Sequence, residues 1–483
     1  MKEIFSFFGT NRWGMSCWLV LIVLGLFSGC ATFHPHPIDP QHVEAKLRER
    51  TLTDPGLRAY VEAAVPGKLS EWPPQVWDLT LLTLVALYYH PDLDVARAMW
   101  EIAEAGVVTA RGRPNPSVEL APGYASNSVP GITPWLLNSP VDIPIETAGK
   151  RGYRILHATH LSEAVRLTIA VTAWQVRSGV RKSLLALYAA AQTEARLSRQ
   201  QEVREDIVTV MEQRLAAGEI ALPEVTLVRI ALDQTWLSLR DVQRQRAEAR
   251  VQVADALGVP VEVLHSVTLS FDSFAHSPPQ LPAQEVQRQT LLSRPDILAT
   301  LAEYAASESA LQLEIAKQYP DLHLGPGYDL DTGDNKWSLG FSLVLPVLNR
   351  NEGPIAEAEA RRRETAARFT ALQARVIGEL DRTLAGYQAA LQKLATADTL
   401  LSAHTEQQES QQALFAAGEA DRFALFNARL EYEVSALSRF NALVQAQQAL
   451  GLLEDAVQRP LSPPGSLPLV PETRPRVEEE SNR

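Results

Sequence analysis

An internal duplication constrains the fold of this 483-residue sequence more than any other feature. Four short strings return in the second half in the same order as in the first. The pairs are His90-Pro91-Asp92-Leu93 with Arg294-Pro295-Asp296-Ile297, Pro122-Gly123-Tyr124 with Pro326-Gly327-Tyr328, Ala216-Ala217-Gly218-Glu219 with Ala416-Ala417-Gly418-Glu419, and Ala256-Leu257-Gly258 with Ala449-Leu450-Gly451. An ordered set of matches indicates repeated structural units. We therefore expect two homologous halves, residues 74–260 and 283–458, joined by a linker over 261–282.

Each half begins with a helical pattern and then changes to the period of a strand. The helical stretches, 74–111 and 283–318, each contain an X-Pro-Asp string, which puts proline in the first turn and a carboxylate where the helix dipole favours it. From Trp337 onward the residues alternate between apolar and small or polar, as in a half-buried strand. We expect two strands in each half, over 117–124 and 137–145 and over 322–330 and 337–345, with a turn at 331–335.

Long helical hairpins are expected to follow the strands. Residues 153–217 and 353–417 contain no proline except Pro354. Apolar residues recur at about every third or fourth position over 369–394, and a similar stripe appears over 225–253 on the returning helix of the first hairpin. At 1.5 Å per residue each helix would reach about 95 Å. Gly218 and Gly418 then permit the left-handed backbone at which such a helix can reverse. Each half is therefore predicted to carry one long antiparallel hairpin.

The N-terminus has the pattern of a lipoprotein leader. The apolar run 18–27 is too short to span a bilayer as a helix and suits the apolar core of a signal peptide. It ends in Phe-Ser-Gly before Cys30, which resembles the site at which bacterial lipoproteins are cleaved and acylated. We expect a signal peptide over 1–29, a lipid anchor such as palmitate on Cys30, and an extended or irregular lipid-anchored arm over 30–73. The alternative is an ordinary signal peptide followed by an incidental cysteine.

Several classes of protein are disfavoured. The net charge of −12 disfavours a nucleic-acid partner, because such a protein needs a basic surface. The GxSxG, HExxH and phosphate-binding glycine motifs are absent, so we expect neither an enzyme nor a bound cofactor or metal. No later stretch contains about 18 consecutive apolar residues, so strands would have to make any membrane crossing. The tail, 459–483, is rich in proline and acidic residues and is expected to be disordered.

Four strands are too few to close a membrane barrel, and open strand edges are not tolerated in lipid. Several copies of the chain would therefore share one barrel. The duplication, the Ala-Gly-Glu hairpin tips and the segment 346–353 (Pro-Val-Leu-Asn-Arg-Asn-Glu-Gly) make residues 70–458 resemble the TolC-type outer membrane efflux proteins. The Asn-Arg-Asn-Glu-Gly string, with 146–151 at the matching place in the first half, is most similar to the heavy-metal-efflux branch of that family.

This resemblance implies an α+β membrane protein with a duplicated strand pair and long antiparallel helical hairpins. It implies a homotrimer whose twelve-stranded β-barrel lies in the outer membrane and continues as an α-helical periplasmic tunnel. The chain would be a passive export duct, and its partners would be outer membrane lipid, a periplasmic adaptor protein and an inner-membrane pump of the RND type. The alternatives are a structural coiled-coil lipoprotein of the periplasm and a periplasmic adaptor. The exported compound, the identity of the pump and the residues that gate the periplasmic aperture are left open.

The resemblance also assigns a role to the hairpin tips, which would contact the adaptor. The residues concerned are Gly218, Glu219 and Leu222 in the first hairpin and Gly418, Glu419 and Asp421 in the second. Acidic residues there would also ring the aperture and favour cations. The best-known family member has aspartates beyond its second tip where this chain has Ala424 and Asn427, which leaves Glu219, Glu419 and Asp421 as acidic candidates. The alternative is a pair of plain solvated turns.

Overall fold

The computed structural model describes residues 31, 33–67, 71–126, 131–281 and 293–461. The chain divides into two units, 1–49 and 50–483, and each is described by itself. The expected signal peptide, Cys30 and the tail from residue 462 onward lie outside the described residues. In the first unit, helix α2 (Pro40–Arg48) begins after Asp39, whose carboxylate accepts a hydrogen bond of 3.0 Å from the backbone N–H of Gln41.

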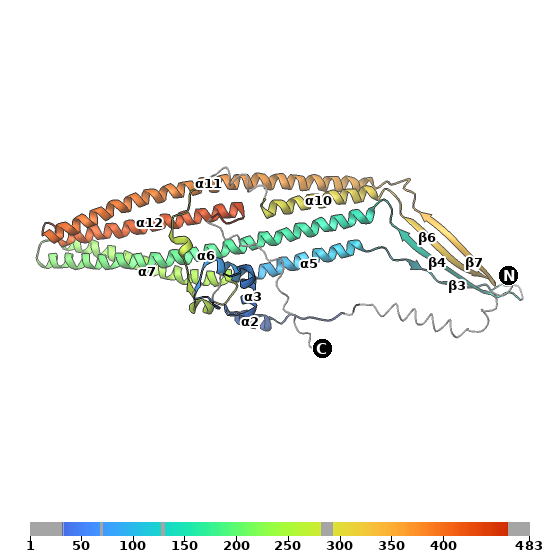
Figure 1. Ribbon diagram of the computed structural model, residues 1–483, viewed down its shortest axis with the longest axis horizontal. Coiled ribbons are helices and arrows are strands. Elements are labelled where there is room, and N and C mark those ends of the chain that lie inside the picture. Colours follow the sequence, from blue (N-terminus) through green and yellow to red (C-terminus); the bar gives the residue numbers. More distant parts are fainter. Residues whose placement is uncertain (1–30, 32, 68–70, 127–130, 282–292, 462–483) are drawn as a thin grey trace. The chain divides into compact units, whose positions relative to one another are not determined.

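The second unit follows the duplicated order predicted from the sequence (Figure 1). Its first half contains, in chain order, α3 (Pro55–Ala64), β1 (Val76–Trp77), α4 (Leu79–Tyr89), α5 (Pro91–Arg111), β2 (Ser117–Val118), β3 (Ala121–Tyr124), β4 (Trp135–Ile145), α6 (Lys150–Ala216) and α7 (Leu222–Leu257). Three short elements follow, namely the 3-10 helix η1 (Val261–His265), β5 (Thr268–Leu269) and α8 (Asp272–Ala275). The second half contains α10 (Pro295–Ala316), β6 (Leu322–Asp331), β7 (Asp334–Leu343), α11 (Glu352–Ala417) and α12 (Arg422–Val457).

The longer strands form one antiparallel sheet that joins the two halves. Its order is β2-β4-β6-β7, and β3 also pairs with β4. The turn between β6 and β7 is tighter than the predicted 331–335. Thr332 and Gly333, with φ of 51° and 101°, form a two-residue loop of the kind that matches the twist of the flanking strands. All four predicted strand segments are present, with a break between β2 and β3. β4 begins two residues and β7 three residues earlier than predicted, and β7 ends at Leu343 and not at residue 345.

The two long helices run from the strands to the hairpin tips (Figure 1). The expected bounds, 153–217 and 353–417, agree with α6 and α11 to within a turn of helix. α7 packs along α6 and α12 along α11, and α6 also contacts α12, α10 and α5. Gly258, with φ of 70°, ends α7 two residues before the predicted end of the first half at residue 260.

The largest hydrophobic core lies where α3 and α4 pack against α6 and the end of α7. α4 is apolar on almost every side, and Leu82, Leu84 and Leu87 on it are buried. Smaller clusters follow the helical hairpins toward their tips. Within the described ranges, no helix is both long enough and apolar enough to span a membrane.

The expectation of an extended or irregular arm over 30–73 is wrong for α2 and α3. In α3, Asp54 caps the helix by accepting a hydrogen bond of 2.8 Å from the backbone N–H of Leu57. Leu57 and Val61 are fully buried in the largest core. At ten residues, α3 is shorter than the stretch over which a helical period can be recognised in a sequence.

Two further expectations are corrected by the structure. The helix predicted over 74–111 is split into α4 and α5 at His90, because the residue before a proline is disfavoured in helical backbone. The linker predicted over 261–282 contains η1, β5 and α8. β5 pairs in parallel with β1, and Phe274 is buried against the largest core. The helix predicted over 283–318 corresponds to α10 (Pro295–Ala316), and residues 283–292 lie outside the described ranges.

Candidate functional site

The sheet has an apolar face. Directly opposed residues of an antiparallel pair point to the same face, and alternate residues along a strand point to opposite faces. The register opposes Phe341 to Leu324 and Leu324 in turn to Ile143. On β4, β6 and β7 this face carries Trp135, Leu137, Val141, Ile143, Ile145, Leu322, Leu324, Tyr328, Leu330, Trp337, Leu339, Phe341 and Leu343.

The opposite face of the sheet is polar, and its side chains pair across the strands. Asn138 Nδ2 donates a hydrogen bond of 2.6 Å to Asp329 Oδ1. Nδ1 of His323 lies 3.0 Å from each carboxylate oxygen of Asp142. These pairs link β4 to β6, so the polar face is ordered as well as hydrophilic.

Both edges of the sheet are open among the residues that the structure describes. β7 forms one edge and all of its residues are exposed, with Trp337 82% exposed. β2 and β3 lie at the other edge. Unpaired strand edges and a large exposed apolar surface are unfavourable in water. The sheet is therefore suited to an apolar solvent on one face and to further strands at its edges.

The first hairpin tip joins α6 to α7. Gly218 has φ of 75°, and its N–H donates a hydrogen bond of 2.9 Å to the carbonyl oxygen of Leu215. Instead of a side-chain cap at the start of α7, the backbone N–H of Ala221 donates to Glu224 Oε1 at 3.1 Å. Glu219 is exposed and Leu222 is 59% exposed. This tip thus presents a carboxylate and an apolar side chain to solvent.

The second tip repeats the turn but is tied to the first hairpin. Gly418 has φ of 79° and Glu419 is exposed. Asp421 caps α12, since its Oδ1 accepts a hydrogen bond of 2.7 Å from the backbone N–H of Ala424. Its Oδ2 accepts a second one of 2.5 Å from Nη2 of Arg214 on α6. The hydrogen bond from Ala424, followed by that from Arg214, lowers the pKa of Asp421 below its ordinary value.

The tip residues predicted from the sequence therefore fall into two groups. Gly218, Glu219, Leu222, Gly418 and Glu419 lie at the surface of their turns. Asp421, which the sequence suggested as an acidic residue of the aperture, is engaged in a cap and an ion pair that hold the two hairpins together. The sequence could not indicate this ion pair, because Arg214 belongs to the other half of the duplication.

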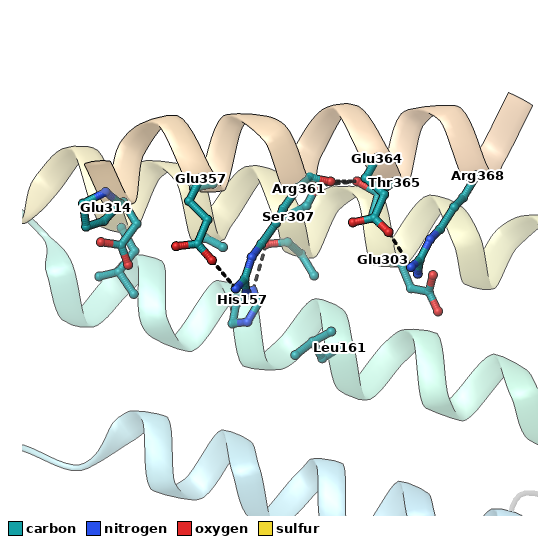
Figure 2. A pocket seen from close by; sticks show the side chains of 15 residues that line it. His157, Leu161, Glu303, Ser307, Glu314, Glu357, Arg361, Glu364, Thr365 and Arg368 are labelled. Atoms are coloured by element: carbon teal, nitrogen blue, oxygen red, sulfur yellow. Dashed lines mark hydrogen bonds and ion pairs between the residues drawn. The ribbon is translucent and has the colours of Figure 1, made fainter. Parts of the chain in front are cut away.

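A groove of about 580 Å³ lies between α6, α10 and α11 (Figure 2). Along its α11 wall, Arg361 pairs with Glu357 and Arg368 pairs with Glu364, each one turn apart. His157 on α6 places Nδ1 2.8 Å from the carbonyl oxygen of Ala306 on α10. Because its α11 cations are paired with carboxylates, this wall is hydrophilic without a strong preference for one sign of charge.

A buried cluster that the sequence analysis missed joins α6 to α12 at the end of their contact far from the hairpin tips. We call Arg177, Arg181, Gln447 and Glu454 the root cluster. Glu454 Oε2 lies 3.2 Å from Arg177 Nη1 and 3.3 Å from Arg181 Nε, and Arg181 Nη2 donates to the carbonyl oxygen of Gln447 at 3.0 Å. All four side chains are buried. One feature of the sequence could have indicated this cluster. Glu454 and Asp455 lie in the last turn of a helix, where the helix dipole disfavours carboxylates, so a cationic partner is expected.

No metal centre emerges from the part of the chain that the structure describes, where no group of three or more His, Cys, Asp or Glu side chains is placed to hold an ion. The features that stand out are the two-faced sheet, the long hairpins and their tips. Together they define a class of protein in which a two-faced sheet is continued by long helical hairpins.

The comparisons with known proteins agree with this class. Residues 84–259 and 286–457 match the model of the outer membrane efflux protein family. The chain therefore belongs to the outer membrane efflux protein family and is placed in the outer membrane. This confirms the family resemblance found in the sequence.

Individual relatives are more distant. The cobalt-zinc-cadmium resistance protein CzcC of Cupriavidus metallidurans is 25% identical over 284 residues, which cover 58% of this chain and 66% of CzcC. The pyoverdine export outer membrane protein OpmQ of Pseudomonas aeruginosa is 26% identical over 305 residues, which cover 61% of this chain and 60% of OpmQ. The matches thus span less than two thirds of either relative.

The solved structure of the outer membrane protein VceC of Vibrio cholerae has the same fold. Its TM-score is 0.64 at 18% sequence identity, and the match covers 79% of this chain and 96% of VceC. At this identity the likeness concerns the fold alone.

Proposed function

We propose that the chain is the outer-membrane channel of a tripartite efflux system, a passive export duct that works with a periplasmic adaptor and an inner-membrane pump. The two-faced sheet continued by long helical hairpins carries this proposal. An apolar face suits lipid and a polar face suits a water-filled lumen. α6 and α11 follow β4 and β7 and extend the path away from the sheet. A structural lipoprotein would need neither the polar strand face nor the open edges.

The open edges support a homotrimer. β2 and β3 both pair with β4 and act as two pieces of one strand, so each copy contributes four strands. Three copies, with β7 of one beside β2 and β3 of the next, contribute twelve and leave no edge in the lipid. The helices of the three copies then form one tunnel.

The hairpin tips are the proposed docking site for the adaptor. Leu222 offers an apolar contact and Glu219 and Glu419 offer charge at exposed turns. Gly218 and Gly418 keep these turns small, so a partner can approach the backbone closely. Asp421 contributes indirectly, because it fixes the second turn against α6.

The polar strand face favours cations as cargo. On β4, β6 and β7 this face carries four carboxylates, those of Asp142, Asp329, Asp331 and Asp334, and one lysine, Lys336. Acidic side chains that line a pore favour the passage of cations. We therefore propose divalent metal ions as the exported compounds, in line with the name of CzcC, although the other matched relative is named for pyoverdine export.

The first experiment is single-channel recording of the purified full-length protein in planar bilayers, with the oligomeric mass determined on the same sample. We expect a trimer with a steady, cation-selective conductance. A monomer without conductance would reject the shared channel. A trimer whose pore prefers anions would keep the channel and reject the proposed cargo.

Adaptor docking has a separate test. Leu222→Asp should abolish growth on cobalt, zinc or cadmium in cells that carry the complete system, and should leave the conductance of the purified trimer unchanged. Ser238→Asp, on the exposed surface of α7 beyond the tip, is the matched control and should retain both. Equal metal resistance of cells with the two variants would mean that the adaptor docks somewhere other than Leu222.

A further inference from the structure

One side chain on the polar face of the sheet differs from the others in its chemistry. His323, the second residue of β6, lies directly opposite Pro144 on β4 and Ser342 on β7. Asp142 comes two residues before Pro144 and therefore lies on the same face. In the described strands of this sheet, the polar face otherwise carries carboxylates and Lys336 as its titratable groups. His323 adds a neutral nitrogen ligand to a face of charged oxygens.

The contact with Asp142 determines which nitrogen of His323 carries the lone pair. Nδ1 lies 3.0 Å from each carboxylate oxygen of Asp142. A lone pair on Nδ1 would point at two negative oxygens, so Nδ1 carries a proton and donates it to the carboxylate. In the neutral imidazole the lone pair is then on Nε2, which makes no hydrogen bond within the described ranges. A carboxylate that holds a histidine in this way orients the ring and makes Nε2 a stronger metal ligand.

The imidazole of His323 can be reached from solvent. Its side chain is 37% exposed, and that of Asp142 is 48% exposed. His323 also lines a groove of about 880 Å³ at the end of the sheet from which the helices continue. An ion that moves over the polar face or through this groove therefore meets the imidazole.

The charges around His323 favour a cation. The lysine and arginine side chains that line the groove are paired with carboxylates, namely Lys150 with Asp321, Arg154 with Glu146, and Lys317 with Glu314. Asp142 adds a further negative charge, which no lysine or arginine neutralises within the described residues. A neutral His323 therefore lies in surroundings that attract a positive ion more than a negative one.

An imidazole separates one class of cation from another. Its nitrogen binds transition-metal ions such as Zn²⁺ and Ni²⁺, whereas Mg²⁺ and Ca²⁺ prefer oxygen ligands. Since no group of three or more His, Cys, Asp or Glu side chains is placed to hold an ion in the described part of the chain, water must fill the other coordination positions. Such a contact is weak. Weak binding suits a conducting path, because an ion that is held tightly cannot leave.

We infer that His323 is a transient ligand for transition-metal ions in the lumen of the duct. A hydrated ion exchanges one water molecule for Nε2 of His323, and Asp142 is the positioning residue that keeps the imidazole in the tautomer that can bind. Each copy of the trimer carries one such ligand. This inference deepens the proposed function by selecting transition metals over Mg²⁺ and Ca²⁺ as cargo, and it rests on that function because it requires the polar strand face to line a pore.

The test is block of the single-channel current by metal ions in the full-length protein. Zn²⁺ or Mg²⁺ is added as the chloride to potassium chloride solution, and the concentration that halves the potassium current is measured for each ion. We expect Zn²⁺ to block the wild-type channel at a concentration at least about tenfold lower than Mg²⁺ does. His323→Gln should raise the half-blocking concentration of Zn²⁺ at least about tenfold, since loss of even an outer partner of a ligating histidine costs about 10–100-fold in metal affinity. The value for Mg²⁺ should stay the same.

Two further variants separate positioning from charge. Asp142→Asn weakens the contact that orients the imidazole, and it should raise the half-blocking concentration of Zn²⁺ more than that of Mg²⁺, but less than His323→Gln does. Asp329→Asn is the matched control, because Asp329 lies on the same face and bonds to Asn138 instead of His323. It should change the values for Zn²⁺ and Mg²⁺ by the same factor.

The other outcomes distinguish this inference from the proposed function. A cation-selective channel that Zn²⁺ blocks equally well in His323→Gln would keep the duct and reduce the contact of His323 with Asp142 to a hydrogen bond between strands. Equal block of the wild-type channel by Zn²⁺ and Mg²⁺ would also overturn the inference, and this comparison needs no variant, so it decides the matter even if His323→Gln fails to assemble. A wild-type protein without conductance would reject the proposed function, and the metal ligand with it.

Discussion

The contact between α6 and α12 is built differently at its two ends. At the root cluster, Glu454 bridges Arg177 and Arg181 in a fully buried setting beside the largest hydrophobic core. At the tips, the contact depends on a smaller hydrophobic cluster and on the exposed pair of Arg214 with Asp421. The same two helices thus have one strongly fixed end and one weakly fixed end.

This difference indicates where the hairpins can move. Between the two ends, apolar contacts such as Tyr188 with Phe440 alternate with a polar contact that is incompletely satisfied. Gln200 Nε2 donates to the carbonyl oxygen of Glu433 at 3.1 Å, while Oε2 of Glu433 is buried without a hydrogen-bond partner among the described residues. Regions with few buried apolar contacts open at lower free-energy cost than cores do. Within one chain, α6 and α12 are therefore held together more firmly at the root than toward the tips.

The largest effect is expected from Glu454→Ala. Removing this carboxylate leaves Arg177 and Arg181 as buried charges without their shared partner, which costs about 3–5 kcal/mol in the free energy of unfolding. Thermal unfolding of the detergent-solubilised protein, followed by circular dichroism, would measure the loss. Glu163→Ala removes the exposed pair with Arg166 and is the control, with an expected cost of about 0–1 kcal/mol. Equal losses would mean that the root is no stronger than a surface pair.

The second prediction concerns Gly451, whose place on α12 lies against the guanidinium of Arg181. A Cβ added there would meet Arg181 Nη1 more closely than real Cβ atoms approach any heavy atom. Gly451→Ala therefore displaces Arg181 and should cost about 1–3 kcal/mol of unfolding free energy. Gly386→Ala, where a Cβ meets nothing, should instead be neutral or stabilising by up to about 1 kcal/mol.

A double-mutant cycle sharpens this second prediction. If Gly451 matters because it leaves room for the bond from Arg181 to Glu454, Gly451→Ala should cost much less in the Glu454→Ala background. Strict additivity of the two losses would show that the glycine acts through something other than the root cluster.

The third prediction concerns the tip end of the contact between α6 and α12. Asp421→Ala removes the cap of α12 and the pair with Arg214, and should cost about 1 kcal/mol, localised at the tip. We expect this local loss of stability to appear as faster hydrogen exchange in the first turns of α12, with unchanged exchange in peptides that contain the root cluster. Asp421→Asn keeps the cap and should show a smaller change, and Glu419→Ala should show none. An effect that spreads to the root would contradict the separation of the two ends.

The comparison also explains what the sequence could predict. The duplication, the strand alternation and the glycines at 218, 258 and 418 are local signals, and they located the strands, the long helices and the hairpin ends. Each of these glycines has a positive φ, so the sequence reported a backbone requirement directly.

Contacts between distant segments gave no such signal. Asp421 has the pattern of an outward-facing acid, and only the fold brings Arg214 to it. α3 and α8 are too short for a clear period, yet they fill the largest core because of residues contributed by α4 and α6. The sequence shows which side chains need burial or a partner, and the packing of the two halves decides which partner they obtain.

The smallest effect, and the one that probes the weak contact most directly, is expected from Glu433→Gln. Burial raises the pKa of Glu433, while the nearby Arg199 and Arg196 of α6 and Arg429 of α12 oppose the rise. The folded protein then holds this proton at a higher pH than the unfolded chain, whose glutamates titrate near about 4.3. Since the folded state binds more protons in that window, stability falls as the pH rises through it.

At neutral pH the wild-type contact therefore carries the cost of a partly buried carboxylate, and Glu433→Gln removes that cost. Hydrogen exchange in the middle of α12, corrected for the intrinsic effect of pH, should be slower in the variant at pH 7 and equal to wild type near pH 4. The pH dependence of stability that Asp421 contributes has the opposite sign. Because its pKa is lowered, its stabilising contribution is lost only as the pH falls through that lowered value. A variant that exchanges faster at pH 7 would mean that the arginines around Glu433 stabilise its charge, and the tip end would then be closed more firmly than its burial suggests.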